Sequence, residues 1–201
     1  MILYITPENR HLYRKQVDQY FRIRKTVFHD TLKWDVQTHG DMEYDKYDSM
    51  PCTYVLYLTS TGEVSGGLRQ MRMTGPTLTW EKFADMVEDR TQIFSAKVTE
   101  TTRFVIRPQE KDVRVSSGVN RTAIELCNAS LEYGLSQGIT RHVAICEERV
   151  VKLTRLFGVQ CQTIGRRATS NGDDILCVSW EVSSASLEKL AWVKSHYAVA
   201  S

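Results

Sequence analysis

Apolar residues along this chain recur with the two periods of regular secondary structure, in an order that predicts a mixed α/β fold. Short runs rich in β-branched and aromatic residues predict strands at residues 2–5, 53–59, 64–73, 97–107, 142–146, 160–168 and 175–182. Apolar residues at three- and four-residue steps predict a helix that starts at Pro7, with Thr6 as its N-cap, and helices at residues 80–88, 118–137, 147–157 and 187–196. Because these elements follow one another without repeats or a linker, we expect a single domain spanning residues 1–201.

The first predicted helix carries an arginine on its apolar face. That face is formed by Val17, Tyr20, Phe21, Arg24 and Phe28. An arginine in such a place is expected to be buried, and a buried charge needs a partner. We therefore expect Arg24 to pair with a carboxylate of Asp45, Asp48 or Glu100.

Polar segments separate these elements. Residues 35–51 are acidic and contain Gly40 and Pro51, and residues 109–117 are polar, so both segments are expected to be loops. Thr61-Gly62 and Asn171-Gly172 are typical of tight turns between paired strands.

The composition is that of an ordinary globular protein, with 42% hydrophobic and 25% charged residues among 201. The N-terminus has neither a basic start nor a long apolar stretch, and no apolar run is long enough to span a membrane. The five cysteines are odd in number and lack C-x-x-C spacing. We expect a reduced, cytoplasmic protein without a structural metal.

The net charge of +2 is too small to favour nucleic-acid binding, but its distribution is uneven. From Arg103 to Arg167, eleven lysines and arginines stand against six acids. Five of the basic residues follow the strand at 142–146: Arg149, Lys152, Arg155, Arg166 and Arg167. They form either an ordinary solvated helix face or a docking surface for an acidic partner.

The densest chemistry lies between Arg24 and Asp48 and continues to Phe104. Arg24 and Phe28 form an R-x-x-x-F motif that is followed by Trp34. An E-x-D-x-y-D motif follows at Glu43, Asp45, Tyr47 and Asp48. Downstream motifs are G-x-R at Gly67 to Arg69, T-G-P at Thr74 to Pro76 followed by Leu78 and Phe83, and E-x-T-R-F at Glu100 to Phe104.

In this order and spacing the motifs resemble the N-acyl-homoserine lactone synthases of the autoinducer synthase family, over nearly the whole chain. The resemblance implies a fold of the GNAT acyltransferase type, an α-β-α sandwich around a central mixed sheet that is splayed to admit a thioester arm. Three positions depart from the family pattern. Gln70 and Arg72 replace an apolar residue and a proline, and Thr99 stands where a tryptophan often precedes the glutamate.

The resemblance implies a quorum-sensing acyltransferase that needs no cofactor. The amino group of S-adenosylmethionine attacks an acyl thioester carried by acyl carrier protein or coenzyme A. The methionine carboxylate then closes onto its own side chain, which forms the lactone and releases methylthioadenosine. Three other functions are weighed against it: a GNAT enzyme using acyl-CoA and another amine, a catalytically silent binder of acyl carrier protein, and nucleic-acid binding. The sequence lacks a clear phosphate-binding loop, and residues 114–118 match the pattern of such a loop only weakly. This argues against a GNAT enzyme that uses acyl-CoA and another amine.

The residue types suit that chemistry. Glu100 is the candidate base for the substrate ammonium, directly or through water. Asp45 and Asp48 are expected to orient this ammonium, and Phe28, Trp34 and Phe83 to surround the sulfonium by cation–π contact. The planar forks of Arg24, Arg69 and Arg103 can bind the substrate carboxylate or fix the acids. The competing interpretation is a purely structural network of buried ion pairs.

An acyl tunnel is expected beside the strand at 142–146. Its candidate lining residues are Phe104, Leu126, Val143, Ala144, Cys146 and Leu153, although the same residues also suit ordinary core packing. Family members that make 3-oxo products tend to have a threonine at the end of this strand, where Ala144 and Cys146 lie here. Neither side chain donates a strong hydrogen bond, so an unsubstituted acyl chain is expected.

Overall fold

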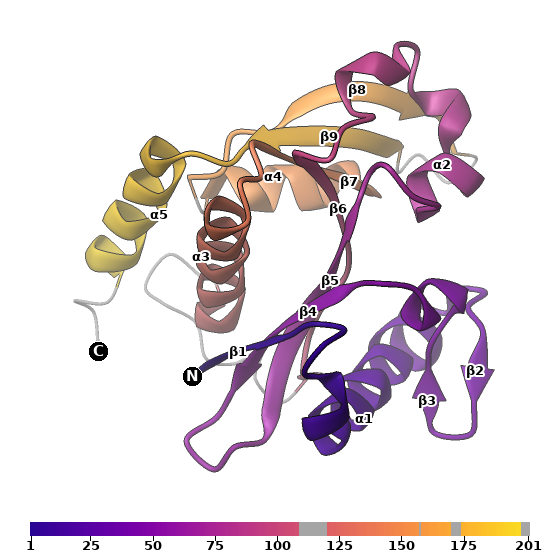
Figure 1. Ribbon diagram of the computed structural model, residues 1–201, viewed down its shortest axis with the longest axis vertical. Coiled ribbons are helices and arrows are strands. Elements are labelled where there is room, and N and C mark those ends of the chain that lie inside the picture. Colours follow the sequence, from indigo (N-terminus) through magenta and orange to yellow (C-terminus); the bar gives the residue numbers. More distant parts are fainter. Residues whose placement is uncertain (109–119, 157, 170–173, 198–201) are drawn as a thin grey trace. The chain divides into compact units, whose positions relative to one another are not determined.

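The computed structural model describes residues 1–108, 120–156, 158–169 and 174–197 (Figure 1). In these residues, hydrogen bonds join the main strands in the order β1-β4-β5-β6-β7-β9-β8. The sheet is mixed, because β6 and β7 are parallel whereas β1–β4, β4–β5, β7–β9 and β8–β9 are antiparallel. This arrangement confirms the predicted α/β class.

The elements have the following bounds. The strands of the main sheet are β1 (Ile2–Ile5), β4 (Thr53–Leu58), β5 (Val64–Arg72), β6 (Val98–Ile106), β7 (Arg141–Glu147), β8 (Gln162–Arg167) and β9 (Ile175–Glu181). A separate hairpin consists of β2 (Thr38–His39) and β3 (Met42–Glu43). The α-helices are α1 (Arg14–Arg24), α2 (Leu78–Lys82), α3 (Arg121–Ser136), α4 (Glu148–Leu156) and α5 (Ser184–Tyr197). Shorter helical turns are η1 (Arg10–Leu12), the π-helical η2 (Lys25–Thr31), η3 (Lys46–Ser49), η4 (Ala84–Met86) and η5 (Arg90–Gln92).

The chain forms two compact units. Unit 1 contains residues 1–70 and 103–129, and unit 2 contains residues 71–102 and the described residues from 130 onwards. The strands β5 and β6 and the helix α3 each contribute residues to both units.

Unit 1 is built on the antiparallel strands β1, β4 and β5. On one face, Tyr20 of α1 packs against Tyr54 of β4, with 5.4 Å between the ring centroids. The hairpin β2–β3 lies beside α1 (Figure 1). A second cluster of buried side chains joins the sheet to the start of α3: Val55, Leu68, Leu126 and Ala129. This double-sided packing fixes the strand that carries Arg69.

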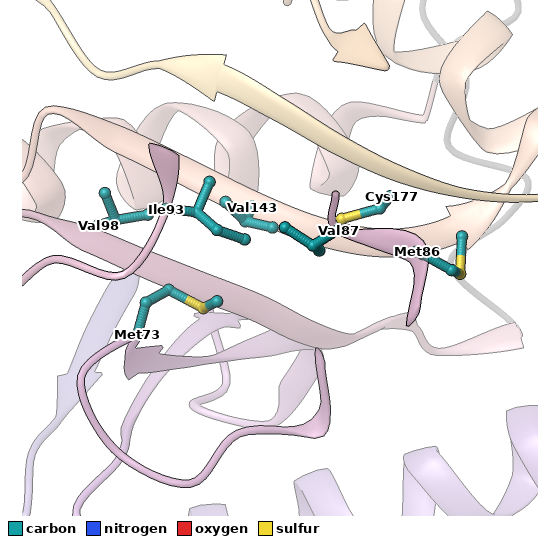
Figure 2. Close-up of a cluster of buried hydrophobic side chains, with 7 residues drawn as sticks. All are labelled: Met73, Met86, Val87, Ile93, Val98, Val143 and Cys177. Atoms are coloured by element: carbon teal, nitrogen blue, oxygen red, sulfur yellow. The ribbon is translucent and has the colours of Figure 1, made fainter. Parts of the chain in front are cut away.

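Unit 2 has β7 at its centre, hydrogen-bonded to β6 and to β9. Successive residues of a strand face opposite sides of a sheet, and the two sides here have separate cores. Figure 2 shows one of them, formed by Met73, Met86, Val87, Ile93, Val98, Val143 and Cys177. The other is formed by Val151 of α4 with Leu176 and Val178 of β9, and Ala144 and Cys146 of β7 pack against it.

The predicted start of the first helix is wrong. The side chain of Asn9 accepts a hydrogen bond from the Thr6 amide (2.8 Å) and donates one to the Tyr4 carbonyl (3.1 Å). These bonds hold the chain in a turn, because they offer the backbone a local alternative to the helical ladder. The α-helix therefore begins only at Arg14.

Two further predictions need correction. The segment 35–51 is not a plain loop, because it contains the hairpin β2–β3 and the turn η3. The helix predicted at 80–88 is interrupted at Phe83 and continues only as the short turn η4. Five predicted features lie outside the described residues: the polar loop 109–117, the phosphate loop considered at 114–118, the helix start at Gly118, the helix end at Phe157 and the turn Asn171-Gly172.

Over the described part of the chain, no helix is both long and apolar enough to cross a membrane. In the same residues, no group of three or more histidine, cysteine or acidic side chains could hold a metal ion.

Candidate active site

Unit 1 brings together six charged residues from four separated segments. Arg24 ends α1, where the helix widens into the π-helical turn η2 that carries Phe28. The acids follow from the hairpin strand β3 and the turn η3: Glu43, Asp45 and Asp48. Arg69 comes from β5 and Arg103 from β6. Three positive and three negative charges thus meet at one place in the unit.

Arg24 has no exposed surface. Its Nη1 and Nη2 donate to the two carboxylate oxygens of Asp48, at 2.9 and 2.8 Å. Its Nε donates to Glu43, with 2.5 Å between the atoms. A guanidinium offers this planar set of donors, which a lysine cannot replace. The expected burial and pairing of Arg24 are confirmed, with Glu43 as an additional partner.

The other two arginines extend the network. Arg69 Nη1 lies 2.6 Å from Asp45 Oδ1 and 2.9 Å from Asp48 Oδ1. Arg103 Nη2 lies 2.8 Å from Asp45 Oδ2 and 3.1 Å from Glu43 Oε1. Each of the three acids therefore has two arginine partners, which compensates for the burial of the charges.

Exposure divides the six residues into an inner and an outer group. Arg24, Glu43 and Arg69 have no exposed surface, and Asp48 is only 2% exposed. The side chains of Asp45 and Arg103 are 14% and 13% exposed. The inner four residues are therefore a scaffold, and the outer pair, Asp45 and Arg103, is the part of the network that a ligand can reach.

Two aromatic rings lie next to the outer pair. The rings of Phe28 and Trp34 are stacked, with centroids 5.1 Å apart and an interplanar angle of 9°. The guanidinium of Arg103 lies 5.5 Å from the centre of the Phe28 ring. Trp34 remains 41% exposed although it is a large apolar residue. An exposed tryptophan stacked on a buried phenylalanine beside a charged pair is suited to an amphipathic cationic ligand.

The electrostatics of the scaffold are set by these contacts. Burial by itself raises the pKa of Asp48, but hydrogen bonds and charge from Arg24, together with the charge of Arg69, hold this pKa well below its usual range. Burial also raises the pKa of Tyr54, whose hydroxyl donates to Asp48 Oδ1 at 2.9 Å. Asp48 is thus ionised at neutral pH.

Glu100 lies in unit 2, on the face of β6 that carries Val98. Its side chain is fully buried. Its carboxylate accepts hydrogen bonds from the backbone amides of Leu78 (3.2 Å) and Thr79 (2.5 Å), at the start of α2. These bonds orient the carboxylate, and they also give it a structural role that the sequence did not reveal.

Phe83, the third aromatic residue of the predicted sulfonium site, also lies in unit 2. Its ring lies 4.9 Å from the guanidinium of Arg167 and packs against the core shown in Figure 2. The cation observed beside the Phe83 ring is therefore the guanidinium of Arg167, a side chain of the protein itself. Whether it contacts the substrate stays a prediction.

The predicted tunnel residues do not share one surface. In unit 2, Val143 belongs to the core of Figure 2, whereas Ala144 and Cys146 face α4 on the other side of the sheet. Leu153 is 53% exposed on α4. In unit 1, Leu126 is buried and Phe104 is 39% exposed. Val143 thus faces the opposite side of the sheet from Ala144 and Cys146, because strand neighbours point in opposite directions, and an acyl tunnel beside this strand stays a prediction.

The basic residues after β7 are largely paired with neighbouring acids. Arg149 contacts Glu147, Lys152 lies 4.0 Å from Glu148, and Arg166 lies 2.5 Å from Asp174. Arg167 bonds to Asp85 at 2.5 Å. Arg155 lines an open groove with Trp192 of α5. The local positive charge is therefore smaller than the sequence count indicated.

Two residues of the site were not assigned a role from the sequence. Glu43 belongs to the E-x-D-x-y-D motif, so its spacing was visible, but its bridging of Arg24 and Arg103 was not. Tyr54 lies in an alternating strand and gave no signal, since only the fold brings its hydroxyl to Asp48.

Solved structures with this fold are acyltransferases. A CoA-dependent acyl-homoserine lactone synthase, MesI, superposes with a TM-score of 0.82 at 27% identity, over 100% of this chain and 97% of that one. A second such synthase, BjaI with S-adenosylmethionine and isopentyl-CoA, has a TM-score of 0.85 at 24% identity, over 100% and 90%. An acyl-CoA N-acyltransferase from Pseudomonas aeruginosa has a TM-score of 0.55 at 11% identity, over 91% and 100%. The chain thus has the fold of these acyltransferase structures.

The sequence comparisons identify the family within this class. An acyl-homoserine-lactone synthase from Agrobacterium fabrum is 27% identical over 164 residues, 82% of this chain and 78% of that protein. The model of the autoinducer synthase family matches residues 8–190. The chain belongs to the autoinducer synthase family and is an acyl-homoserine-lactone synthase. The alternative of a GNAT enzyme acting on another amine is not favoured.

Proposed function

We propose that the outer pair and the aromatic stack of unit 1 bind S-adenosylmethionine, whose amino group is acylated with the help of Glu100. The observation that carries this proposal is the exposure of Asp45 and Arg103 on an otherwise buried network, next to Phe28 and Trp34. S-adenosylmethionine offers an ammonium, a carboxylate and a sulfonium. The site offers a carboxylate, a guanidinium and two aromatic faces in return.

Each substrate group has a matching partner. The ammonium is placed at Asp45, and the substrate carboxylate at the planar fork of Arg103. The sulfonium lies against the ring of Trp34 or Phe28 by cation–π attraction. The buried acids Glu43 and Asp48 with Arg24 and Arg69 hold this pair in place, since a scaffold of paired charges permits little movement.

The acylation step requires a free amine. An α-amino group has a pKa near about 8, so most of it is protonated at neutral pH and must lose a proton before it attacks. Glu100 accepts this proton, directly or through a water. The amine nitrogen then bonds to the thioester carbonyl carbon while the carbon–sulfur bond breaks, which releases the thiol of the donor.

The lactone forms in the second step. The carboxylate oxygen of the methionine part attacks the carbon bonded to the sulfonium, and the carbon–sulfur bond breaks. Methylthioadenosine leaves as a neutral thioether, which makes the sulfonium a good leaving group. Arg103 holds the carboxylate in the required direction, so a single residue serves both binding and ring closure.

The donor is an acyl thioester on coenzyme A or on acyl carrier protein. Use of coenzyme A is supported by the CoA-dependent relative MesI, which is 27% identical. Use of acyl carrier protein is supported by the exposed basic residues of α4, of which Lys152 is 71% exposed. Both donors deliver the same thioester to the amine.

The direct test is release of methylthioadenosine from purified protein. It should require both S-adenosylmethionine and an acyl thioester, and mass spectrometry of an organic extract should show the matching lactone. Absence of acyl-dependent release with a panel of acyl-CoA and acyl carrier protein donors would contradict the proposed function.

A further inference from the structure

Tyr20 connects the scaffold of the site to the backbone of Arg103. It lies in α1, one turn before Arg24, and has no exposed surface. Its hydroxyl donates a hydrogen bond to the main-chain carbonyl of Arg103, with 2.8 Å between the oxygen atoms. Its ring also lies beneath the Arg24 guanidinium, 5.3 Å from its centre. Tyr20 therefore contacts both an inner and an outer arginine of the network.

The backbone of Arg103 is strained. Arg103 has a φ of 55° inside β6, a left-handed conformation that residues with a side chain rarely adopt. Such a conformation is unfavourable for a residue with a side chain and persists only when the surroundings hold it. The hydrogen bond from Tyr20 acts on the carbonyl of this same residue. It is therefore placed to hold the conformation that sets the direction of the Arg103 side chain.

Gly67 of β5 provides the space in which Tyr20 lies. A Cβ atom built at Gly67 would lie 3.0 Å from the Tyr20 ring and 2.4 Å from the side chain of Leu56. Any larger residue would therefore push against the ring. The two named residues of the G-x-R motif thus have different roles. Arg69 forms ion pairs with Asp45 and Asp48, and Gly67 leaves space for the side chains of Tyr20 and Leu56.

We propose that Tyr20 is a positioning residue for the reaction. Its hydroxyl holds the strained backbone of Arg103, so that the guanidinium is directed at the carboxylate of S-adenosylmethionine. Burial raises the pKa of Tyr20, which keeps the hydroxyl protonated and able to donate. This inference rests on the proposed function, in which Arg103 contacts the substrate.

The test is Tyr20→Phe, which removes one oxygen and leaves the ring in the space beside Gly67. The dissociation constant for S-adenosylmethionine, measured by calorimetry without an acyl donor, should rise roughly 5- to 30-fold. The KM for the acyl donor should stay within about twofold. The matched control is Tyr4→Phe in the same unit, because the Tyr4 hydroxyl also donates to a backbone carbonyl, that of Ala129, at 3.3 Å. This control should bind S-adenosylmethionine like the unmodified protein.

A double-mutant cycle separates positioning from general stability. If Tyr20 acts through Arg103, Tyr20→Phe should not weaken binding further in an Arg103→Ala background. Two outcomes would overturn the role of Tyr20 but not the substrate site. In the first, the effects of the two substitutions on the affinity for S-adenosylmethionine are additive. In the second, Tyr20→Phe binds S-adenosylmethionine normally while Arg103→Ala binds it more weakly. An unchanged affinity of Arg103→Ala would instead overturn the substrate site together with this inference.

Discussion

At the scale of single residues, the observed structural role of Glu100 can be separated from its proposed catalytic role. Its carboxylate orients the start of α2 through the amides of Leu78 and Thr79, and it is the candidate base. Glu100→Gln cannot take a proton, and its single amide oxygen can accept from only one of the two backbone amides, because Leu78 and Thr79 donate to different carboxylate oxygens. We expect turnover to fall by about 10²-fold or more, and the free energy of unfolding to fall by about 1–3 kcal/mol because one buried amide loses its acceptor.

Two measurements decide between these roles of Glu100. Single-turnover rates report on the chemical step, and urea denaturation reports on the helix contacts. Near-normal turnover in Glu100→Gln would remove the base role from Glu100. Asp45, the partly exposed acid of the ion-pair network, would then be the next candidate to examine by Asp45→Asn.

Arg24 is the residue on which the stability of the scaffold depends most. Arg24→Ala leaves Glu43 and Asp48 buried without their common partner. The free energy of unfolding should fall by about 3–5 kcal/mol, because an uncompensated buried charge is strongly destabilising. The measurement is the urea midpoint at pH 7.

Arg22 supplies the matched control for this prediction. It lies two residues earlier on α1 and bonds to Asp41 at 2.6 Å, but 47% of its side chain is exposed. Arg22→Ala should change the free energy of unfolding far less than Arg24→Ala, since exposed ion pairs contribute little. Equal losses for the two variants would show that burial of the network does not matter.

At the scale of elements, α4 is where the donor can be distinguished. Reversing Lys152 and Arg155 to glutamate should raise KM for acyl carrier protein and leave KM for S-adenosylmethionine unchanged, because exposed charges mainly steer encounter. Added salt should act in the same direction, since the screening length is about 10 Å near 0.1 M.

The corresponding reversal of Arg14 and Lys15 on α1 is the control, as both side chains are exposed in unit 1. It should leave the carrier kinetics unaffected. If the α4 reversal also has no effect while acyl-CoA is used efficiently, the enzyme takes its acyl group from coenzyme A.

At the scale of the whole molecule, stability should fall in acid in two stages. Burial lowers the pKa of His142 to about 4, partly offset by its hydrogen bond to the Ser130 carbonyl. The unfolded chain has the ordinary value of about 6.5, so it binds a proton first as the pH falls. Stability is therefore complete above pH 6.5 and is lost between pH 6.5 and 4, by about 2 kcal/mol between pH 7 and 5. The lowered pKa of Asp48 adds a second loss below about pH 4.

Urea titrations at several pH values test this dependence. His142→Asn should be less stable at pH 7 but should show a flatter profile between pH 7 and 5. The matched surface substitution for comparison is His11→Asn, at an exposed histidine. An unchanged slope in His142→Asn would mean that another group is responsible for the first stage.

Local patterns in the sequence determined the element order, the α/β class and the family. Periodicity placed the main strands and helices because it depends only on residues that are near one another in the chain. The burial of Arg24 followed from the same rule, whereas the candidate acids were found through the resemblance of their motif to the family. Where a side chain competed with the helical ladder, as Asn9 does at the first turn, periodicity misplaced the boundary.

The packing of the chain in three dimensions determines which site residues form the buried scaffold and which a ligand can reach. Glu43 bridges arginines that are 19 and 60 residues away, and Tyr20 reaches a carbonyl 83 residues further along the chain. The difference in exposure between the inner scaffold and the Asp45–Arg103 pair has no counterpart in residue type or spacing. Burial and pairing are properties of neighbours in space, and the chain brings those neighbours together only when its strands and helices pack.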